Sequence, residues 1–249
     1  MPSPPVNQND VSQVDGWPAR LGRLLLPPRC LVCGEPGADG HDLCAACRQA
    51  LPWNSACCER CGLPMPERVP NCGRCLRKPP PLDRVHAAFR YGFPVDRLLP
   101  RFKFHQDLAA GRELAEAMRA TLVADLAEAD GRPQALIPVP LHPARLRERG
   151  YNQALELARP LARAFAIPLL EGGLQRIRDI APQSELGALV RRRNPRGAFA
   201  AGEQALPAHV TLVDDVMTTG ATLHECARVL RRAGVQRVEA WVAARVARG

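Results

Sequence analysis

From residue 83 onwards, short apolar runs alternate with stretches that repeat their apolar residues at helical spacing. Apolar runs of strand length lie at Val85–Tyr91, Leu136–Val139, Val210–Val213 and Val238–Val246. Helical spacing predicts helices over Leu108–Ala127, Asn152–Phe165 and Ala221–Ala233. Strands that alternate with helices are typical of βαβ units, so the fold class expected is α/β with a mostly parallel sheet.

The ends of two helices are marked by residues that favour helix termini. Asn152 is suited to cap the first turn of Asn152–Phe165, and Gly234 to follow the last turn of Ala221–Ala233. Pro160 lies inside the first of these helices, where its ring and missing N–H are expected to kink or split it.

The first 82 residues have a different character from the rest. Residues 1–20 are polar and rich in proline, and we expect a disordered tail there that lacks the apolar core of a signal peptide. Residues 21–78 are dense in cysteine, Pro79–Pro81 predicts a stiff linker over 79–82, and the α/β domain covers 83–249. With no apolar run long enough to span a bilayer, a cytoplasmic location is expected.

Nine of the ten cysteines lie between residues 30 and 75, and eight of these form two sets with identical spacing. Each set consists of two Cys-x-x-Cys pairs separated by ten residues, and two such pairs supply the four thiolates of a tetrahedral zinc site. The ligands expected for two structural zinc ions are Cys30, Cys33, Cys44 and Cys47 in one set, and Cys58, Cys61, Cys72 and Cys75 in the other.

Other interpretations of the cysteines remain open at this level. A disulfide framework fits poorly with a reducing compartment, and an iron–sulfur cluster fits the spacing less well than zinc. The pairs can also interleave, with Cys30 and Cys33 joined to Cys58 and Cys61. Cys57 can stand in for Cys58 or be structural, and Cys226 is expected in the core.

An acidic pair and a small-residue loop follow the apolar run at Val210–Val213. Asp214 and Asp215 come first, then Thr218, Thr219 and Gly220, and the helix from Ala221. The N–H groups at a helix start bind phosphate, and two carboxylates can accept hydrogen bonds from vicinal sugar hydroxyls. A capped turn alone explains the threonines but not two adjacent like charges beside a buried strand, so a ribose phosphate is the expected ligand.

The chain carries a formal net charge of +9, which is compatible with polyphosphate or nucleic acid as a partner. In the cysteine-rich segment, Trp53 is a candidate surface for stacking single-stranded bases among several arginines and a lysine. The alternative is a solvated basic face with one tryptophan that covers a small core. The basic residues concerned are Arg48, Arg60, Arg68, Arg74, Arg77 and Lys78.

The sequence LVDDVMTTGAT resembles the loop with which type I phosphoribosyltransferases bind phosphoribosyl pyrophosphate (PRPP). Further motifs narrow the resemblance to the competence protein F (ComF) family, over about residues 30–249. These motifs are the eight paired cysteines, Arg101–Lys103, the stretch from Pro138–His142 through Arg149–Gln153, and the stretch from Gln183 through Arg191–Asn194. The resemblance implies a type I phosphoribosyltransferase-like sheet flanked by helices, preceded by a double zinc ribbon.

The resemblance also implies roles for individual residues. Asp214 and Asp215 are the candidate catalytic residues, which hold the ribose hydroxyls directly or through Mg²⁺ that accompanies PRPP. The 5-phosphate is assigned to the loop Met217, Thr218, Thr219, Gly220, Ala221 and Thr222, and the diphosphate to Leu141, His142 and Arg145. The arginine-rich segment Gly173–Phe199 resembles the mobile loop that closes over PRPP.

Three functions follow from these features. The resemblance implies a PRPP-binding protein with a role in DNA uptake during natural competence, with single-stranded DNA and helicase or recombination proteins as partners. The alternatives are an active phosphoribosyltransferase with an unknown acceptor and a non-catalytic sensor of PRPP or nucleotides. No base-recognition motif is found, so the sequence does not identify an acceptor.

Overall fold

A computed structural model describes residues 28–128, 131–178 and 195–247. The chain forms two compact units that divide between Gln49 and Ala50. The small unit contains the first cysteine set and helix α2 (Ala45–Gln49). The large unit contains the second cysteine set, helix α3 (Gly73–Arg77) and all the strands that form ladders. The domain boundaries at 78 and 83 stay predictions, because the compact units divide elsewhere.

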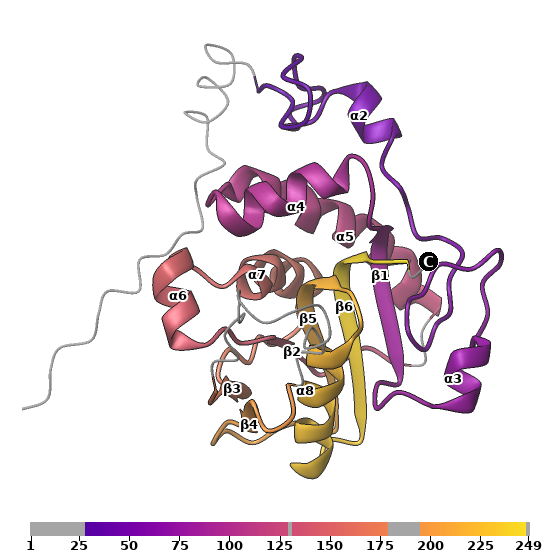
Figure 1. Ribbon diagram of the computed structural model, residues 1–249, viewed down its shortest axis with the longest axis vertical. Coiled ribbons are helices and arrows are strands. Elements are labelled where there is room, and N and C mark those ends of the chain that lie inside the picture. The colour runs from indigo at the N-terminus through magenta and orange to yellow at the C-terminus, as the bar shows by residue number, and fades with distance from the viewer. Residues whose placement is uncertain (1–27, 129–130, 179–194, 248–249) are drawn as a thin grey trace, which may run out of the picture. The chain divides into compact units, whose positions relative to one another are not determined.

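A four-stranded parallel sheet forms the centre of the large unit (Figure 1). Its order is β1 (Arg84–Arg90), β6 (Arg237–Arg245), β5 (His209–Met217) and β2 (Ala135–Pro138). The residues of β2, β5 and β6 are almost all buried, apart from a few near the ends of β5. This is expected of parallel strands that are covered on both faces. The α/β fold with a mostly parallel sheet is therefore confirmed.

Strand β5 is longer than the sequence predicted, and the end predicted at Val213 is wrong. It continues through the acidic pair to Met217, because β6 still pairs with it there: Asp214 lies opposite Val242 and Met217 opposite Arg245. On its other side, the ladder with β2 ends where Pro138 meets Val213. The acids therefore occupy a strand that is paired on one side only, and not a loop.

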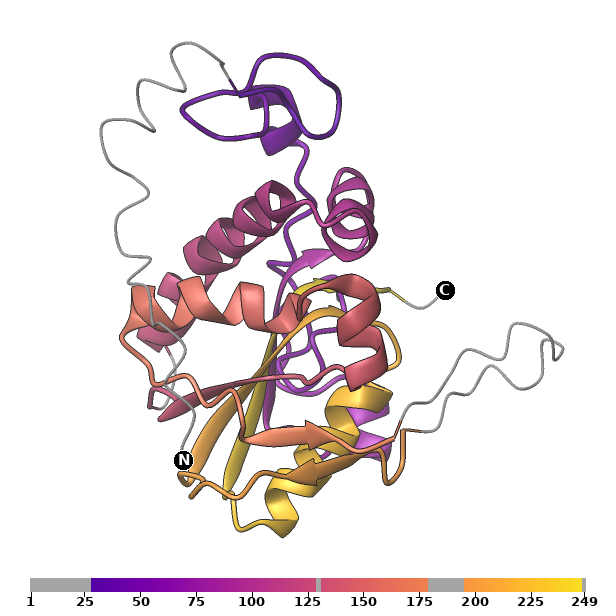
Figure 2. The ribbon, with the colours of Figure 1, turned by 90° about the vertical axis from the view of Figure 1, so that its left-hand side faces the viewer.

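Helices cover the two faces of the sheet unequally. On one face, α5 (Leu108–Glu128) and α7 (Gln153–Phe165) contact the strands, and α4 (Val95–Phe104) packs on α5; α8 (Ala221–Arg232) covers the other face (Figures 1 and 2). A short antiparallel pair, β3 (Leu174–Arg176) with β4 (Phe199–Ala201), lies beside α8. The sequence did not predict α4, α6 (Pro143–Arg149), β3 or β4.

The predicted helix ends are confirmed. The Asn152 carboxamide oxygen accepts the Ala154 N–H at 3.0 Å as the cap of α7. Gly234 adopts a φ of 97° after α8 and donates to Arg231, while Val235 donates to Leu230, which completes a Schellman motif. Pro160 does not split α7, which is a single helix of 13 residues.

The segment before the second cysteine set covers the outer edge of β1. The N–H groups of Asn54 and Arg90 donate to Ala88 and Pro52, and Val85 donates to Glu59. Trp53 forms an isolated bridge with Phe89, and their rings lie 4.8 Å apart. An open edge strand invites pairing with other chains, so this segment protects the sheet.

In the part of the chain that the structure describes, no helix has both the length and the apolar character that crossing a bilayer requires.

Candidate functional site

Asp214 and Asp215 lie at the carboxyl end of β5, beyond the point where β2 stops pairing. Each carboxylate accepts a hydrogen bond from the N–H group of the next residue. Asp214 Oδ1 accepts from the Asp215 N–H at 2.9 Å, and Asp215 Oδ1 accepts from the Val216 N–H at 2.7 Å. Asp215 is buried, whereas Asp214 is partly exposed. In open α/β sheets, ligands bind beyond the carboxyl ends of the strands, which is where this pair lies.

Lys103 from α4 neutralises one of the two acids. Its Nζ lies 2.8 Å from Asp215 Oδ2. Lys103 also acts on Asp214, but burial and the Asp215 carboxylate outweigh it and raise the pKa of Asp214 to about 7. A ligand that brings hydroxyl donors or a cation to Asp214 would therefore relieve an unfavourable electrostatic arrangement.

The loop from Met217 to Thr222 turns β5 into α8. Gly220 caps the helix with a φ of 79°, which strains any residue with a side chain, and a Cβ at this position would lie 2.5 Å from Met217 Cε, so Met217 would have to move. Thr219 Oγ1 accepts the Ala221 N–H at 3.2 Å. Thr218 and Thr219 are exposed beside the first turn of a helix of 12 residues, whose N–H groups carry partial positive charge.

A buried arginine holds the start of this loop. Arg245, at the end of β6, is 2% exposed, and its Nη1 donates to the carbonyls of Met217 at 3.0 Å, Thr218 at 2.6 Å and Val246 at 2.8 Å. Its Nε donates to the carbonyl of Cys61 at 3.0 Å. One guanidinium therefore connects the predicted phosphate loop with the second cysteine set.

The candidate diphosphate residues Leu141, His142 and Arg145 follow β2 at the same edge of the sheet. The Val139 N–H donates to the Val213 carbonyl at 2.9 Å, so the chain leaves β2 directly beside Asp214. His142 Nδ1 accepts the Ala144 N–H at 3.3 Å and so caps the short helix α6. The topology brings this loop and the acidic pair to one edge, and the assignment of these residues to the diphosphate stays a prediction.

The predicted closing loop, Gly173–Phe199, begins and ends in the β3–β4 pair. Arg176 lies over the Phe199 ring, 5.6 Å from its centroid. Residues 179–194, which include Arg191, Arg192 and Arg193, lie outside the described residues.

The eight cysteines gather in two groups of four, in the order in which they follow along the chain and without interleaving. Tetrahedral Zn–S bonds of about 2.3 Å place sulfur atoms about 3.8 Å apart. The Sγ atoms of Cys33 and Cys44 are 3.6 Å apart, those of Cys61 and Cys72 3.9 Å, and those of Cys58 and Cys75 4.0 Å. Both groups therefore fit a zinc ion.

The pKa values of the cysteines move in both directions, since burial raises those of Cys47, Cys61 and Cys75 while backbone N–H groups lower that of Cys72. Burial opposes ionisation of Cys72, but N–H groups of Cys75 and Arg74 outweigh it and lower its pKa to about 7. Cys58 belongs to the second group and Cys57 does not, so Cys57 is no substitute for it. Cys226 is buried in the core against the sheet, as predicted.

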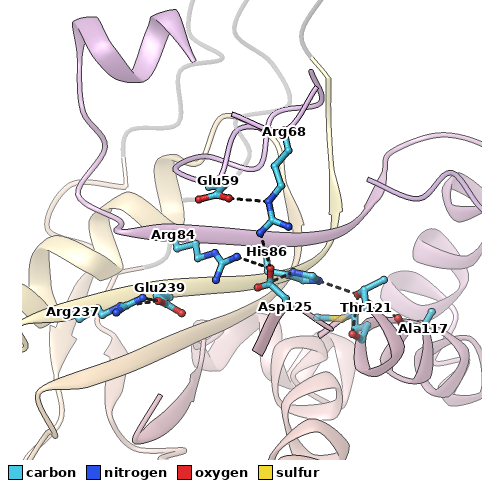
Figure 3. Close-up of polar contacts among 10 residues, drawn as sticks. Glu59, Arg68, Arg84, His86, Ala117, Thr121, Asp125, Arg237 and Glu239 are labelled. Carbon is cyan, nitrogen blue, oxygen red and sulfur yellow. Dashed lines mark hydrogen bonds and ion pairs between the residues drawn. The ribbon is translucent and has the colours of Figure 1, made fainter. Parts of the chain in front are cut away.

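A second polar cluster joins the cysteine-rich segment to the sheet (Figure 3). At its centre Asp125 of α5 lies 2.6 Å from Arg84, 3.3 Å from His86 and 3.4 Å from Arg68. Arg68 also pairs with Glu59 at 2.8 Å. Burial raises the pKa of Asp125, but His86 and the two arginines outweigh it and hold that pKa below its usual value. Ion pairs of this cluster therefore connect α5, β1 and the cysteine-rich segment that carries Glu59 and Arg68.

Two residues of the site had no role assigned from the sequence. Lys103 lies in the Arg101–Lys103 motif, but α4 was missed because Pro94 and Pro100 mask its apolar spacing. Arg245 is a charge that directly follows the apolar residues 240–244 of β6, which indicates a buried partner. Both signals are present in the sequence.

Two family models match the chain, and they fit the two kinds of site described above. A double zinc ribbon domain matches residues 21–76, and a phosphoribosyl transferase domain matches residues 152–249, including the acidic pair and the loop.

Curated relatives cover most of the chain. DNA utilization protein YhgH of Escherichia coli O157:H7 is 35% identical over 224 residues, which cover 88% of this chain and 97% of that protein. Competence protein F of Haemophilus influenzae is 35% identical over 228 residues, with 87% and 96% covered. Competence protein ComFC of Bacillus subtilis is 28% identical over 206 residues, with 82% and 72% covered. The chain therefore belongs to the competence protein F family, in which a double zinc ribbon is joined to a phosphoribosyltransferase domain.

Proposed function

We propose that this protein binds Mg²⁺·PRPP at the carboxyl edge of the sheet. The observation that carries the proposal is the acidic pair at the end of β5, followed at once by the glycine-capped start of α8. A carboxylate pair suits vicinal hydroxyls, a helix start suits a phosphate, and the two lie at the separation that one short loop allows.

Each residue has a distinct task in this proposal. Asp214 and Asp215 accept hydrogen bonds from the ribose hydroxyls, and Lys103 pairs with Asp215 and holds its side chain in place. Thr218, Thr219 and the N–H groups that follow Gly220 bind the 5-phosphate. Leu141, His142 and Arg145 face the diphosphate, where a guanidinium can bind two oxygens at once. Bound Mg²⁺ would neutralise the diphosphate charge and hold it in place.

The test is isothermal titration of the zinc-loaded protein with PRPP in the presence of Mg²⁺. Asp214→Asn with Asp215→Asn removes both negative charges with little change in shape and should abolish the heat of binding. The matched control is Asp39→Asn with Asp42→Asn, an acid pair of the small unit, which should bind as the wild type does. Equal binding by all three proteins would refute the site.

Binding alone does not separate an enzyme from a sensor. Release of pyrophosphate that depends on an added base would identify a phosphoribosyltransferase and its acceptor. Binding without release across a panel of bases would favour the sensor.

We also infer a role in DNA handling during natural competence, in the cytoplasm. Support comes from relatives named for competence and for DNA utilization, and from the basic charge of the chain. Single-stranded DNA is the expected ligand, with helicase or recombination proteins as partners. Cysteine thiols stay reduced in the cytoplasm and can bind zinc there, which supports a cytoplasmic location.

A further inference from the structure

A cavity lined by arginines lies away from the acidic pair, at the far end of α8. Its volume is about 750 Å³. Arg228, Arg231 and Arg232 come from the last turns of α8, while Arg60 comes from the second cysteine set and Arg196 from the segment before β4. Three separate parts of the large unit thus bring five guanidinium groups to one hollow.

Carboxylates compensate only part of this charge. Glu225 is buried in the cavity wall and pairs with Arg228 at 2.9 Å and with Arg232 at 3.9 Å. Asp83 pairs with Arg231. Arg196 aside, the four arginines Arg60, Arg228, Arg231 and Arg232 face these two carboxylates, which leaves a surplus of two positive charges among these described residues. Arginines in the last turn of a helix also complement its dipole, but that does not explain why Arg60 and Arg196 converge on the same place.

Glu225 fixes the geometry of the cavity. It accepts the Gly197 N–H at 3.0 Å, and this bond together with Arg228 and Arg232 holds its pKa below the usual value, although burial acts in the opposite direction. Ionised Glu225 therefore aims two guanidinium groups and ties the segment before β4 to α8. The other face of Arg228 and Arg232 stays accessible, since their side chains are 48% and 70% exposed.

We propose that this cavity binds the phosphodiester backbone of single-stranded DNA. The proposal rests on the DNA-handling function inferred above and places that function on a surface distinct from the PRPP site. From Thr222 to Arg232 a helix rises about 15 Å, so the two sites lie at opposite ends of α8. Guanidinium groups match phosphate oxygens in paired hydrogen bonds, and several of them along a hollow suit a chain of phosphates.

The composition of the cavity predicts how the strand is recognised. Among the described residues that line it, none is aromatic, so bases have no stacking surface there. Trp53, the stacking candidate from the sequence, lines another cavity of about 300 Å³, whose Arg68 and Arg84 are paired with Glu59 and Asp125. We therefore expect binding that is sensitive to salt and tolerant of sequence.

The experiment is fluorescence anisotropy of a labelled oligothymidine, measured over a series of salt concentrations. Each lost phosphate contact lowers the salt slope of log K by about 0.7. Arg228→Gln with Arg232→Gln should lower the slope by about 1.4 and weaken binding by about 25-fold at 0.1 M salt, since the lost factor scales as salt to that power. Arg60→Gln, which leaves Glu225 and its partners in place, should lower the slope by about 0.7.

The matched control removes two exposed arginines from the opposite side of the sheet, Arg97→Gln in α4 and Arg163→Gln in α7. This variant has the same net charge as the double cavity variant. If both double variants lose affinity and slope equally, only net charge matters and the site is wrong. If neither the double cavity variant nor Arg60→Gln changes the slope, the site is likewise wrong.

Two further outcomes bear on the ligand. If the wild type binds no oligonucleotide, the DNA function and this proposal both fail, whereas titration with PRPP reports separately on the other site. A last outcome is that tripolyphosphate raises the melting temperature of the wild type but not of Arg60→Gln, while the oligonucleotide does not bind. The cavity would then bind a free phosphate chain, and the proposal that it binds DNA would be wrong.

Discussion

Asp214→Asn should stabilise the ligand-free protein while it removes PRPP binding. Burial and the neighbouring Asp215 carboxylate raise the pKa of Asp214 from 3.8 to about 7 in the folded state. At low pH both the folded and the unfolded chain hold the proton, and there is no penalty. Between pH 3.8 and about 7 the unfolded chain releases it more readily, so stability falls as pH rises, and above about 7 the penalty is constant.

The magnitude follows from the size of the shift. A change of about three units at 1.36 kcal/mol each gives a ceiling of about 4 kcal/mol, and partial exposure of Asp214 reduces the expected value to roughly 2 kcal/mol. An asparagine cannot ionise, yet its Oδ1 can still accept the Asp215 N–H. The variant should therefore escape the penalty without losing the local hydrogen bond.

The assay is urea unfolding of the zinc-loaded, magnesium-free wild type and variant at matched pH values from about 5.5 to 8.5. Because both proteins carry the same zinc sites, their difference isolates position 214. The variant's advantage should grow up to about pH 7 and then level off. An advantage that is independent of pH, or a variant less stable than the wild type at pH 8, would refute the electrostatic argument.

Three other changes test separate features. Gly220→Ala should weaken PRPP binding more than tenfold, because its Cβ collides with Met217. The control Gly131→Ala has a similar φ of 88° but open space around it, and it should bind PRPP normally. Isothermal titration with PRPP compares the affinities of the two variants. Arg245→Met should lower the free energy of unfolding by about 3–5 kcal/mol and speed zinc loss to a chelator from the second cysteine group and not the first. Asp125→Asn should cost about 2 kcal/mol near neutral pH, as measured by urea unfolding. Because the pKa of Asp125 is lowered from 3.8, its stabilisation is fully present above about pH 4, and the difference from the wild type should shrink below that and vanish once the pH has fallen through the lowered folded-state pKa.

The features that the sequence predicted well are those set by local pattern. Cysteine spacing predicted both four-cysteine groups, and periodicity predicted α5, α7 and α8, with Asn152 at the start of α7 and Gly234 after the end of α8. The order of apolar run, acidic pair, small-residue loop and helix led to Asp214, Asp215 and their loop, which lie at the carboxyl edge of the sheet as α/β folds require.

What the sequence did not predict depends on partners that are distant along the chain. Asp214 and Asp215 lie inside a strand because β6 continues beside them, which no local pattern reveals. Helix α4 was missed because its prolines argue against a helix, although Leu98, Leu99 and Phe102 are buried against the fold. The arginine cavity draws on segments separated by more than a hundred residues, so its charge is invisible to any window along the sequence.

The pairing of β1 with β6 has a consequence for synthesis of the chain. Arg84 pairs with Glu239, so β1 leaves the ribosome long before its neighbour in the sheet exists. The segment from Pro52 to Glu59, already made, can pair with the other edge of β1 at once. Zinc uptake by the second cysteine group, which needs only residues up to Cys75, would then hold this cover in place on the nascent chain. In a cell that lacks zinc, the edge of β1 would stay exposed until β6 is synthesised. The unfinished chain would then be prone to aggregate through this edge.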